Sequence, residues 1–191
     1  MKAAVFLDRD GVINREIECL TKPEQLELLP GSPEGIRLLN ENGWVTIVIT
    51  NQPIVAKGDA TIDDVETIHK TLQEQLKRYG ATIDGIYYCP HHPDRGFPGE
   101  REEYKISCNC RKPRTGLVEQ ASKRFDIDVG QSFFVGDKTV DIQTGKNIGC
   151  KTILVRTGYG GSDREFDAKP DFTCKNLFDA AKLVCGGRRS K

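Results

Sequence analysis

The chain has 191 residues, and its 28 Lys and Arg balance its 28 Asp and Glu, so the formal net charge is zero at pH 7. This length can bury the core of one globular domain, and balanced charge predicts no general attraction to nucleic acid or to an anionic membrane. The first apolar run, residues 3–7, is too short for a spanning helix or an export signal. We therefore expect a cytoplasmic protein.

Short apolar runs alternate with longer amphipathic ones, a pattern typical of a parallel sheet covered by helices. In chain order we predict a strand at 3–7, a helix at 33–42, a strand at 45–49, a helix at 62–79, a strand at 85–88, a helix at 116–125, a strand at 132–135, a helix at 140–147 and a strand at 152–155. Thr61 and Asp64 are typical of a capping box that opens the second helix. We expect residues 1–185 to form one domain and residues 186–191 to be a disordered tail.

Polar side chains follow three of the predicted strands at their carboxyl ends. Because these ends meet at one edge of a parallel sheet, we expect the side chains to converge there. Carboxylates are the ligands that Mg²⁺ combines with water and substrate phosphate. The sequence therefore predicts a phosphate site with magnesium, built from Asp8 and Asp10, from Thr50, Asn51 and Gln52, and from Asp137, Lys138 and Asp141.

These residue types suit attack on a phosphate ester. Asp8 is a candidate nucleophile that would form an aspartyl-phosphate. Asp10 could protonate the leaving alkoxide and then deprotonate the water that resolves the intermediate. The phosphoryl oxygens could be bound by Thr50 and Asn51 through hydrogen bonds and by Lys112 and Lys138 through charge. The alternative is that these are ordinary strand-end turns and helix caps.

A long segment without apolar periodicity, residues 89–110, carries cysteine and histidine at its two ends. Cys89, Cys108, Cys110 and either His91 or His92 make the Cys₃His set typical of a closed structural zinc site. The alternative is that Cys89 is a core residue and the other pair is incidental. Because Arg111 and Lys112 directly follow Cys110, a metal here would fix two cations beside the phosphate site.

The ordered set Asp8–Val12, Thr50–Gln52, Lys112 and Gly136–Asp141 resembles the four motifs of the haloacid dehalogenase (HAD) superfamily of phosphohydrolases over essentially the whole chain. The resemblance implies a three-layer, Rossmann-like α/β fold with a central parallel sheet. It implies Asp8 as nucleophile, Asp10 as general acid and base, and Thr50 and Lys112 on the phosphoryl group. It also implies that Mg²⁺ is held by Asp8, the main chain of Asp10 and Asp137, with Asp141 supporting them.

The zinc segment and the Cys110–Pro113 run resemble the branch of this superfamily that contains heptose-bisphosphate and histidinol-phosphate phosphatases. This resemblance favours His91 as the zinc ligand, and the long interval from Cys89 to Cys108 is closer to the heptose enzymes. It implies a small phosphorylated sugar as substrate, with the 7-phosphate of heptose 1,7-bisphosphate the first candidate for removal. The implied substrate-binding residues are Glu16, Thr50, Asn51, Gln52, Arg111, Lys112 and Lys138.

Two segments depart from the pattern of that branch. Pro53–Ile54 stand where Ser-Gly is common, and Glu18–Cys19 replace a Gly-Tyr pair. We expect a minimal cap formed by loops 14–29 and 52–60 and by the zinc loop, and a monomer without nucleic-acid or membrane partners. His69 is expected on a solvated face of its helix. Alternative functions are hydrolysis of histidinol phosphate, of another small phosphate ester or of a phosphorylated nucleic-acid end, and a non-catalytic zinc-stabilised interaction module.

Overall fold

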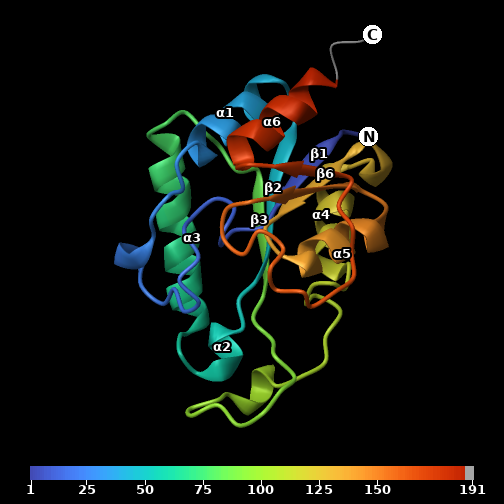
Figure 1. Ribbon diagram of the computed structural model, residues 1–191. Coiled ribbons are helices and arrows are strands. Elements are labelled where there is room, and N and C mark those ends of the chain that lie inside the picture. The colour runs from blue at the N-terminus through green and yellow to red at the C-terminus, as the bar shows by residue number, and fades with distance from the viewer. Residues whose placement is uncertain (188–191) are drawn as a thin grey trace.

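The computed structural model describes residues 1–187 as a six-stranded sheet between two layers of helices (Figure 1). The strands are β1 (Ala4–Leu7), β2 (Val45–Asn51), β3 (Gly85–Cys89), β4 (Phe133–Gly136), β5 (Lys151–Val155) and β6 (Phe172–Cys174). The helices are α1 (Ser32–Glu41), α2 (Ile54–Lys57), α3 (Ile62–Lys77), α4 (Gly116–Phe125), α5 (Thr139–Ile148) and α6 (Leu177–Gly186). The strand order is β3-β2-β1-β4-β5-β6 and neighbouring strands run parallel, so the expected three-layer, Rossmann-like α/β fold with a central parallel sheet is confirmed.

Both faces of the central strands are buried, which explains their continuous apolar runs. In β1, Val5 and Leu7 pack into a cluster with apolar residues of α1, α3 and α6. Phe6 points to the other face, where it packs with residues of α4. Alternation along one strand therefore joins the two outer layers to the sheet.

Every predicted strand and helix is present, with ends that agree to within two residues. The Thr61–Asp64 capping box is also present: Asp64 Oδ2 accepts a hydrogen bond from Thr61 N at 2.8 Å. The structure adds α2, β6 and α6, which were not predicted. β6 is a short edge strand that gives little apolar signal. Gly186, assigned to the tail, ends α6, and residues 188–191 lie outside the described part of the chain.

The prediction for His69 is wrong, because this residue is 3% exposed. It shares the inward face of α3 with Val65, Ile68 and Leu72, at the spacing of three and four residues that marks one side of a helix. Polar, exposed residues lie near His69 in the sequence, and the prediction of a solvated face relied on them.

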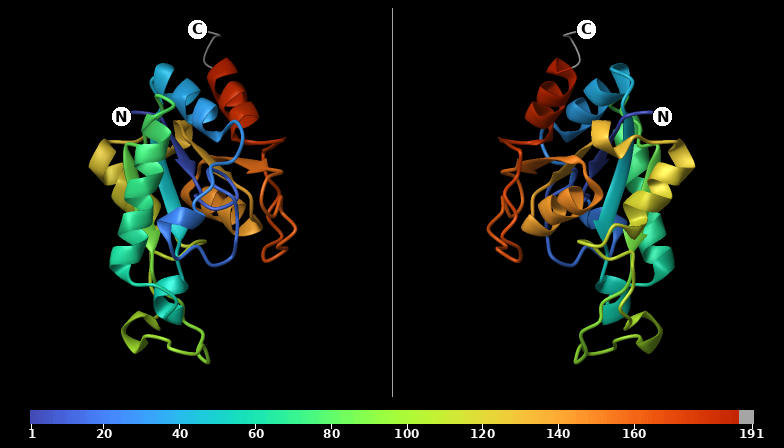
Figure 2. Two further views of the ribbon diagram at one scale, coloured as in Figure 1. Left: turned by 90° about the vertical axis from the view of Figure 1, so that its left-hand side faces the viewer. Right: turned by 90° about the vertical axis from the view of Figure 1, so that its right-hand side faces the viewer.

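The segment between β3 and α4 projects beyond the carboxyl ends of the strands and lies next to α2 (Figures 1 and 2). Its tip is tied to α2 by a hydrogen bond from Arg101 N to Ala56 O at 3.0 Å. None of the helices within residues 1–187 has the length and apolar character needed to cross a membrane.

Candidate active site

Three acidic side chains meet where the strand order reverses between β1 and β4. Asp8 follows β1, Asp137 follows β4, and Asp141 lies in the first turn of α5. All three are buried, and each offers an oxygen within 4.8 Å of the others. This is the crevice in which α/β sheets of this topology bind ligands.

The carboxylates fit a divalent cation. Among residues 1–187, Asp137 Oδ1 is buried without a hydrogen-bond partner, while Oδ2 accepts from Tyr159 N at 2.7 Å. Burial, together with the nearby Asp141 and Asp8, raises the pKa of Asp137 to about 8. A bound cation would relieve this repulsion and use the free oxygen. The oxygens of Asp141 are already engaged by Lys112 Nζ and Lys138 N, so Asp8 and Asp137 are the better ligands.

Lys112 places a buried positive charge among these carboxylates. Its Nζ lies 2.9 Å from Asp8 Oδ1 and 2.6 Å from Asp141 Oδ1, and donates to Ile49 O at 3.1 Å. Burial opposes the charge, but Asp141 and Asp8 outweigh it and raise the pKa of Lys112. Asn51 fixes the main chain of Lys112, because its Oδ1 accepts from Lys112 N at 3.0 Å and its Nδ2 donates to Lys112 O at 3.3 Å.

The carboxylate of Asp10 lies outside the group formed by Asp8, Asp137 and Asp141, and it is held as an anion. Arg9 donates to both its oxygens through Nη2 at 3.0 and 2.9 Å and through Nε at 3.1 Å. Asn14 Nδ2 and Gln52 Nε2 add hydrogen bonds at 2.8 and 2.9 Å. Burial favours the neutral acid, but Arg9 and these donors lower the pKa of Asp10. In this geometry Asp10 is therefore deprotonated, the form in which a carboxylate acts as a base.

No role was predicted for Arg9 from the sequence, but the structure shows that it is completely buried and pairs with Asp10. Its position between two aspartates at the end of an apolar strand was the sequence feature that could have indicated this role. Gln52 also has an unexpected role: its Nε2 bridges Asp10 Oδ2 and Thr50 Oγ1, the latter at 3.1 Å. It links the predicted acid and base to the predicted phosphoryl-binding threonine.

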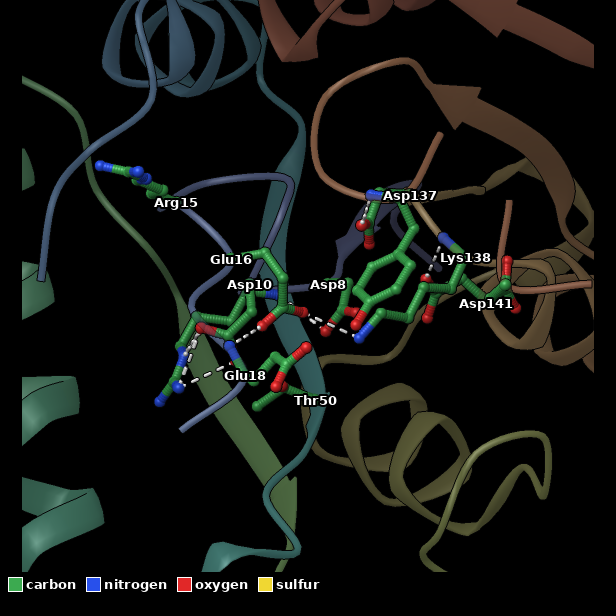
Figure 3. Close-up of polar contacts among 12 residues, drawn as sticks. Asp8, Asp10, Arg15, Glu16, Glu18, Thr50, Asp137, Lys138 and Asp141 are labelled. Atoms are coloured by element: carbon green, nitrogen blue, oxygen red, sulfur yellow. Dashed lines mark hydrogen bonds and ion pairs between the residues drawn. The ribbon is translucent and has the colours of Figure 1, made fainter. Parts of the chain in front are cut away.

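A cavity of about 290 Å³ lies beside these groups and is lined by the predicted site residues Asp10, Glu16, Asn51, Gln52 and Lys138 together with Glu18, Pro53, Lys57 and Tyr159. Glu16 Oε2 pairs with Lys138 Nζ at 2.8 Å, and this ammonium lies 4.4 Å from the centre of the Tyr159 ring (Figure 3).

Arg111 lines a different cavity of about 130 Å³ and donates to His91 O at 3.3 Å. A third cavity, of about 340 Å³, lies at the amino ends of the strands beside Trp44 and Phe133.

The Gly-rich segment after β5, which had no predicted role, holds Asp137 in place. Besides the bond from Tyr159 N, Gly161 N donates to Asp137 O at 2.7 Å. Gly158 has φ +58°, and a Cβ there would lie 2.1 Å from Asp137 Oδ2. Only glycine allows this main chain to approach the carboxylate so closely.

The predicted zinc ligands converge. Cys110 Sγ lies 3.1 Å from Cys89 Sγ, 3.2 Å from Cys108 Sγ and 3.2 Å from His91 Nδ1. His92 instead accepts a hydrogen bond from Asp94 N at its Nδ1. Burial and the hydrogen bond to Cys110 raise the pKa of Cys89, an effect that a metal bound to the thiolates would reverse. Three thiols and one imidazole at these separations could hold a closed, tetrahedral zinc ion.

Comparison with known proteins gives consistent matches. Residues 109–180 match the HAD-hydrolase-like family model. The chain is 39% identical to D-glycero-beta-D-manno-heptose-1,7-bisphosphate 7-phosphatase of Escherichia coli K12, over 95% of this chain and 93% of the relative. It is 37% identical to the corresponding alpha-anomer enzyme of Photorhabdus laumondii, over 94% of each chain.

Among solved structures, the chain is similar to a D,D-heptose 1,7-bisphosphate phosphatase from B. bronchiseptica complexed with magnesium and phosphate. The TM-score is 0.84 and the identity 30%, with 98% of this chain and 99% of the other covered.

Proposed function

This chain belongs to the D-glycero-D-manno-heptose-1,7-bisphosphate 7-phosphatase family of HAD-like hydrolases, and we propose that it hydrolyses the 7-phosphate of that sugar through an aspartyl-phosphate on Asp8. The observation that carries this proposal is the pairing of Asp8 with Lys112 in the crevice beside Asp137. The ammonium of Lys112 lies 2.9 Å from Asp8 Oδ1 and holds this oxygen, the proposed attacking atom, inside the crevice.

In the first step Asp8 attacks phosphorus, a bond from its oxygen to phosphorus forms, and the bond to the sugar oxygen breaks. Asp10 donates to the departing alkoxide the proton that it removed from water in the second step of the preceding turnover. In the second step the Asp10 carboxylate removes a proton from water, which attacks phosphorus and releases Asp8 and inorganic phosphate. The hydroxyl of Thr50 and the ammonium of Lys112 stabilise the phosphoryl oxygens. Magnesium, bound by Asp8, the Asp10 main chain and Asp137 and supported by Asp141, would neutralise phosphoryl charge.

The cavity beside Asp10 is the proposed sugar site. Glu16 offers an acceptor for sugar hydroxyls, Asn51 lines the same cavity, and Lys138 and Lys57 offer positive charge for a second phosphate. Gln52 acts there mainly by aligning Asp10 and Thr50. We keep Arg111 as a substrate contact at the rim, because the zinc cluster and His91 O fix it next to Lys112.

We also propose that residues 1–185 act as one catalytic domain, as a monomer in the cytoplasm. The seven cysteines are free thiols, as in proteins of reducing compartments.

The test is steady-state hydrolysis of both anomers of heptose 1,7-bisphosphate, histidinol phosphate and common sugar phosphates in magnesium. We expect the heptose ester to exceed the others in kcat/KM by 100-fold or more, roughly 3 kcal/mol of transition-state discrimination. Equal turnover of all esters would refute the assigned substrate but not the chemistry.

The matched variant is Asp8→Asn, which removes the nucleophile and keeps the shape of the side chain. We expect no measurable phosphate release, with unchanged circular dichroism and zinc content. Full activity in this variant would rule out the aspartyl-phosphate.

A further inference from the structure

The guanidinium of Arg9 contacts two different side chains. One edge, Nε and Nη2, binds Asp10. The remaining nitrogen, Nη1, lies 3.2 Å from Nε2 of His69, a residue of α3 that is 60 positions away in sequence. Arg9 is 0% and His69 3% exposed, so this contact lies in the interior of the protein.

We propose that His69 is a positioning residue for the general acid and base Asp10 and acts through Arg9. The proposal deepens the function proposed above and rests on the role of Asp10 there. The chain Asp10–Arg9–His69 runs from the reacting groups to the helical layer, and each link is a side-chain contact in the interior.

The protonation of the His69 ring follows from the fact that Arg9 is the donor in this contact. A guanidinium in a protein is always protonated and only donates, so Nε2 of His69 must be the acceptor and the ring proton lies on Nδ1. Burial, with the positive charge of Arg9, lowers the pKa of His69 to about 3. His69 is thus a neutral acceptor across the working pH range of an ordinary enzyme.

Without this acceptor, Nη1 would be a buried donor with no partner at His69, which costs free energy. The planar guanidinium would gain freedom to turn, and any rotation moves Nε and Nη2 off the carboxylate of Asp10. His69 is itself held, because its ring packs edge-on against Tyr88 of β3 with centroids 5.1 Å apart and planes at 67°. Through Arg9 and His69, the orientation of Asp10 is therefore fixed by the sheet and by α3.

A simple packing role for the His69 ring is the competing explanation, and two variants separate it from the proposal. His69→Phe keeps the aromatic ring on Tyr88 and removes the acceptor. His69→Gln loses the ring and keeps an oxygen that can accept from Nη1. We expect His69→Phe to lower kcat for heptose 1,7-bisphosphate tenfold or more with KM within twofold, and His69→Gln to stay within threefold of the wild type.

The second readout is the leaving group. For p-nitrophenyl phosphate the departing phenolate needs no proton, so kcat/KM of His69→Phe should stay within threefold of the wild type, whereas kcat/KM for the heptose ester falls tenfold or more. Should His69→Phe fail to fold, as judged by circular dichroism and zinc content, His69→Leu replaces it.

The proposal is overturned if the acceptor-free variant loses no activity, if His69→Gln loses as much, or if both esters are affected equally. Failure of the proposed function is a different result, because wild-type enzyme would then release no phosphate from the heptose ester.

Discussion

Lys112 is the side chain on which the charges of the site depend. Its ammonium contacts both Asp8 and Asp141, and it is 3% exposed. Burial and Asp8 raise the pKa of Asp141 to about 6 even with Lys112 beside it. A neutral residue at this position would leave the buried carboxylates without their cation, so their mutual repulsion would be uncompensated.

At this scale we expect Lys112→Met to lower kcat by roughly 100- to 1,000-fold, the size of effect seen when one electrostatic contact to a transition state is removed. Met preserves the apolar stem and removes the charge. The measurement is kcat at saturating magnesium and substrate. The control is Lys146→Met on the exposed side of α5, which should retain full activity. Equal kcat in the two variants would contradict the role given to Lys112.

The elements around the site are coupled through the zinc loop and α2. Ala56 N donates to Pro90 O at 3.2 Å, and Gln52 N donates to Cys89 O at 2.7 Å. At the tip of the loop, the ammonium groups of Lys57 and Lys105 each lie 4.7 Å from the ring centre of Phe97. A zinc ion at the base of the loop would therefore position α2, a wall of the cavity, as well as Lys112.

Gly58 tests this coupling, since a Cβ there would lie 1.9 Å from Gly99 O. We expect Gly58→Ala to lower the free energy of unfolding by about 1–3 kcal/mol more than a matched glycine replacement, the usual cost of overpacking. It should also raise KM, because α2 must shift. Urea unfolding and steady-state kinetics measure the two effects.

The matched replacement is Gly149→Ala, which has nearly the same backbone angle, φ +86° against +85°, and open space around its Cβ. It therefore carries the backbone strain without the clash. Equal loss of stability in the two variants would show that the loop does not press on α2.

For the molecule as a whole, the crowded carboxylates make stability depend on pH. The pKa values of Asp137 and Asp141 are raised to about 8 and about 6. In the unfolded chain both titrate near pH 4, at roughly their ordinary values. Between about pH 4 and pH 8 the folded protein holds protons that the unfolded chain has lost, so the free energy of unfolding falls as pH rises when magnesium is absent.

Magnesium should reverse this loss, because it binds the ionised carboxylates and competes with the protons. We expect saturating Mg²⁺ to raise Tm by more at pH 8 than at pH 6, measured by calorimetry on zinc-loaded protein. Asp137→Asn should largely abolish the increase at both pH values. The same increase at both pH values in the wild type would contradict the assignment of these carboxylates to the metal.

The sequence by itself predicted five strands of the sheet, four of the helices that cover it and the convergence of Asp8, Asp137 and Lys112. Apolar strands buried on both faces and amphipathic helices have distinct periodicities, and parallel strands place their carboxyl ends at one edge. Asp8, Asp137 and Lys112 were therefore expected to meet, and they do. The zinc residues were found because cysteine and histidine spacing is informative without knowledge of the fold, although spacing alone left His91 and His92 open.

Only the tertiary structure decided which residues support the catalytic side chains. The positions of Arg9 and His69, the bridging role of Gln52 and the support of Asp137 by the Gly158–Gly161 segment all depend on contacts between segments far apart in the chain. Such contacts leave no local period in the sequence. The spacing of His69 does match the apolar face of α3, but a polar side chain at such a position is buried only where it finds a partner. His69 was misplaced for this reason: its burial depends on a partner, Arg9, that lies in a different strand-end loop.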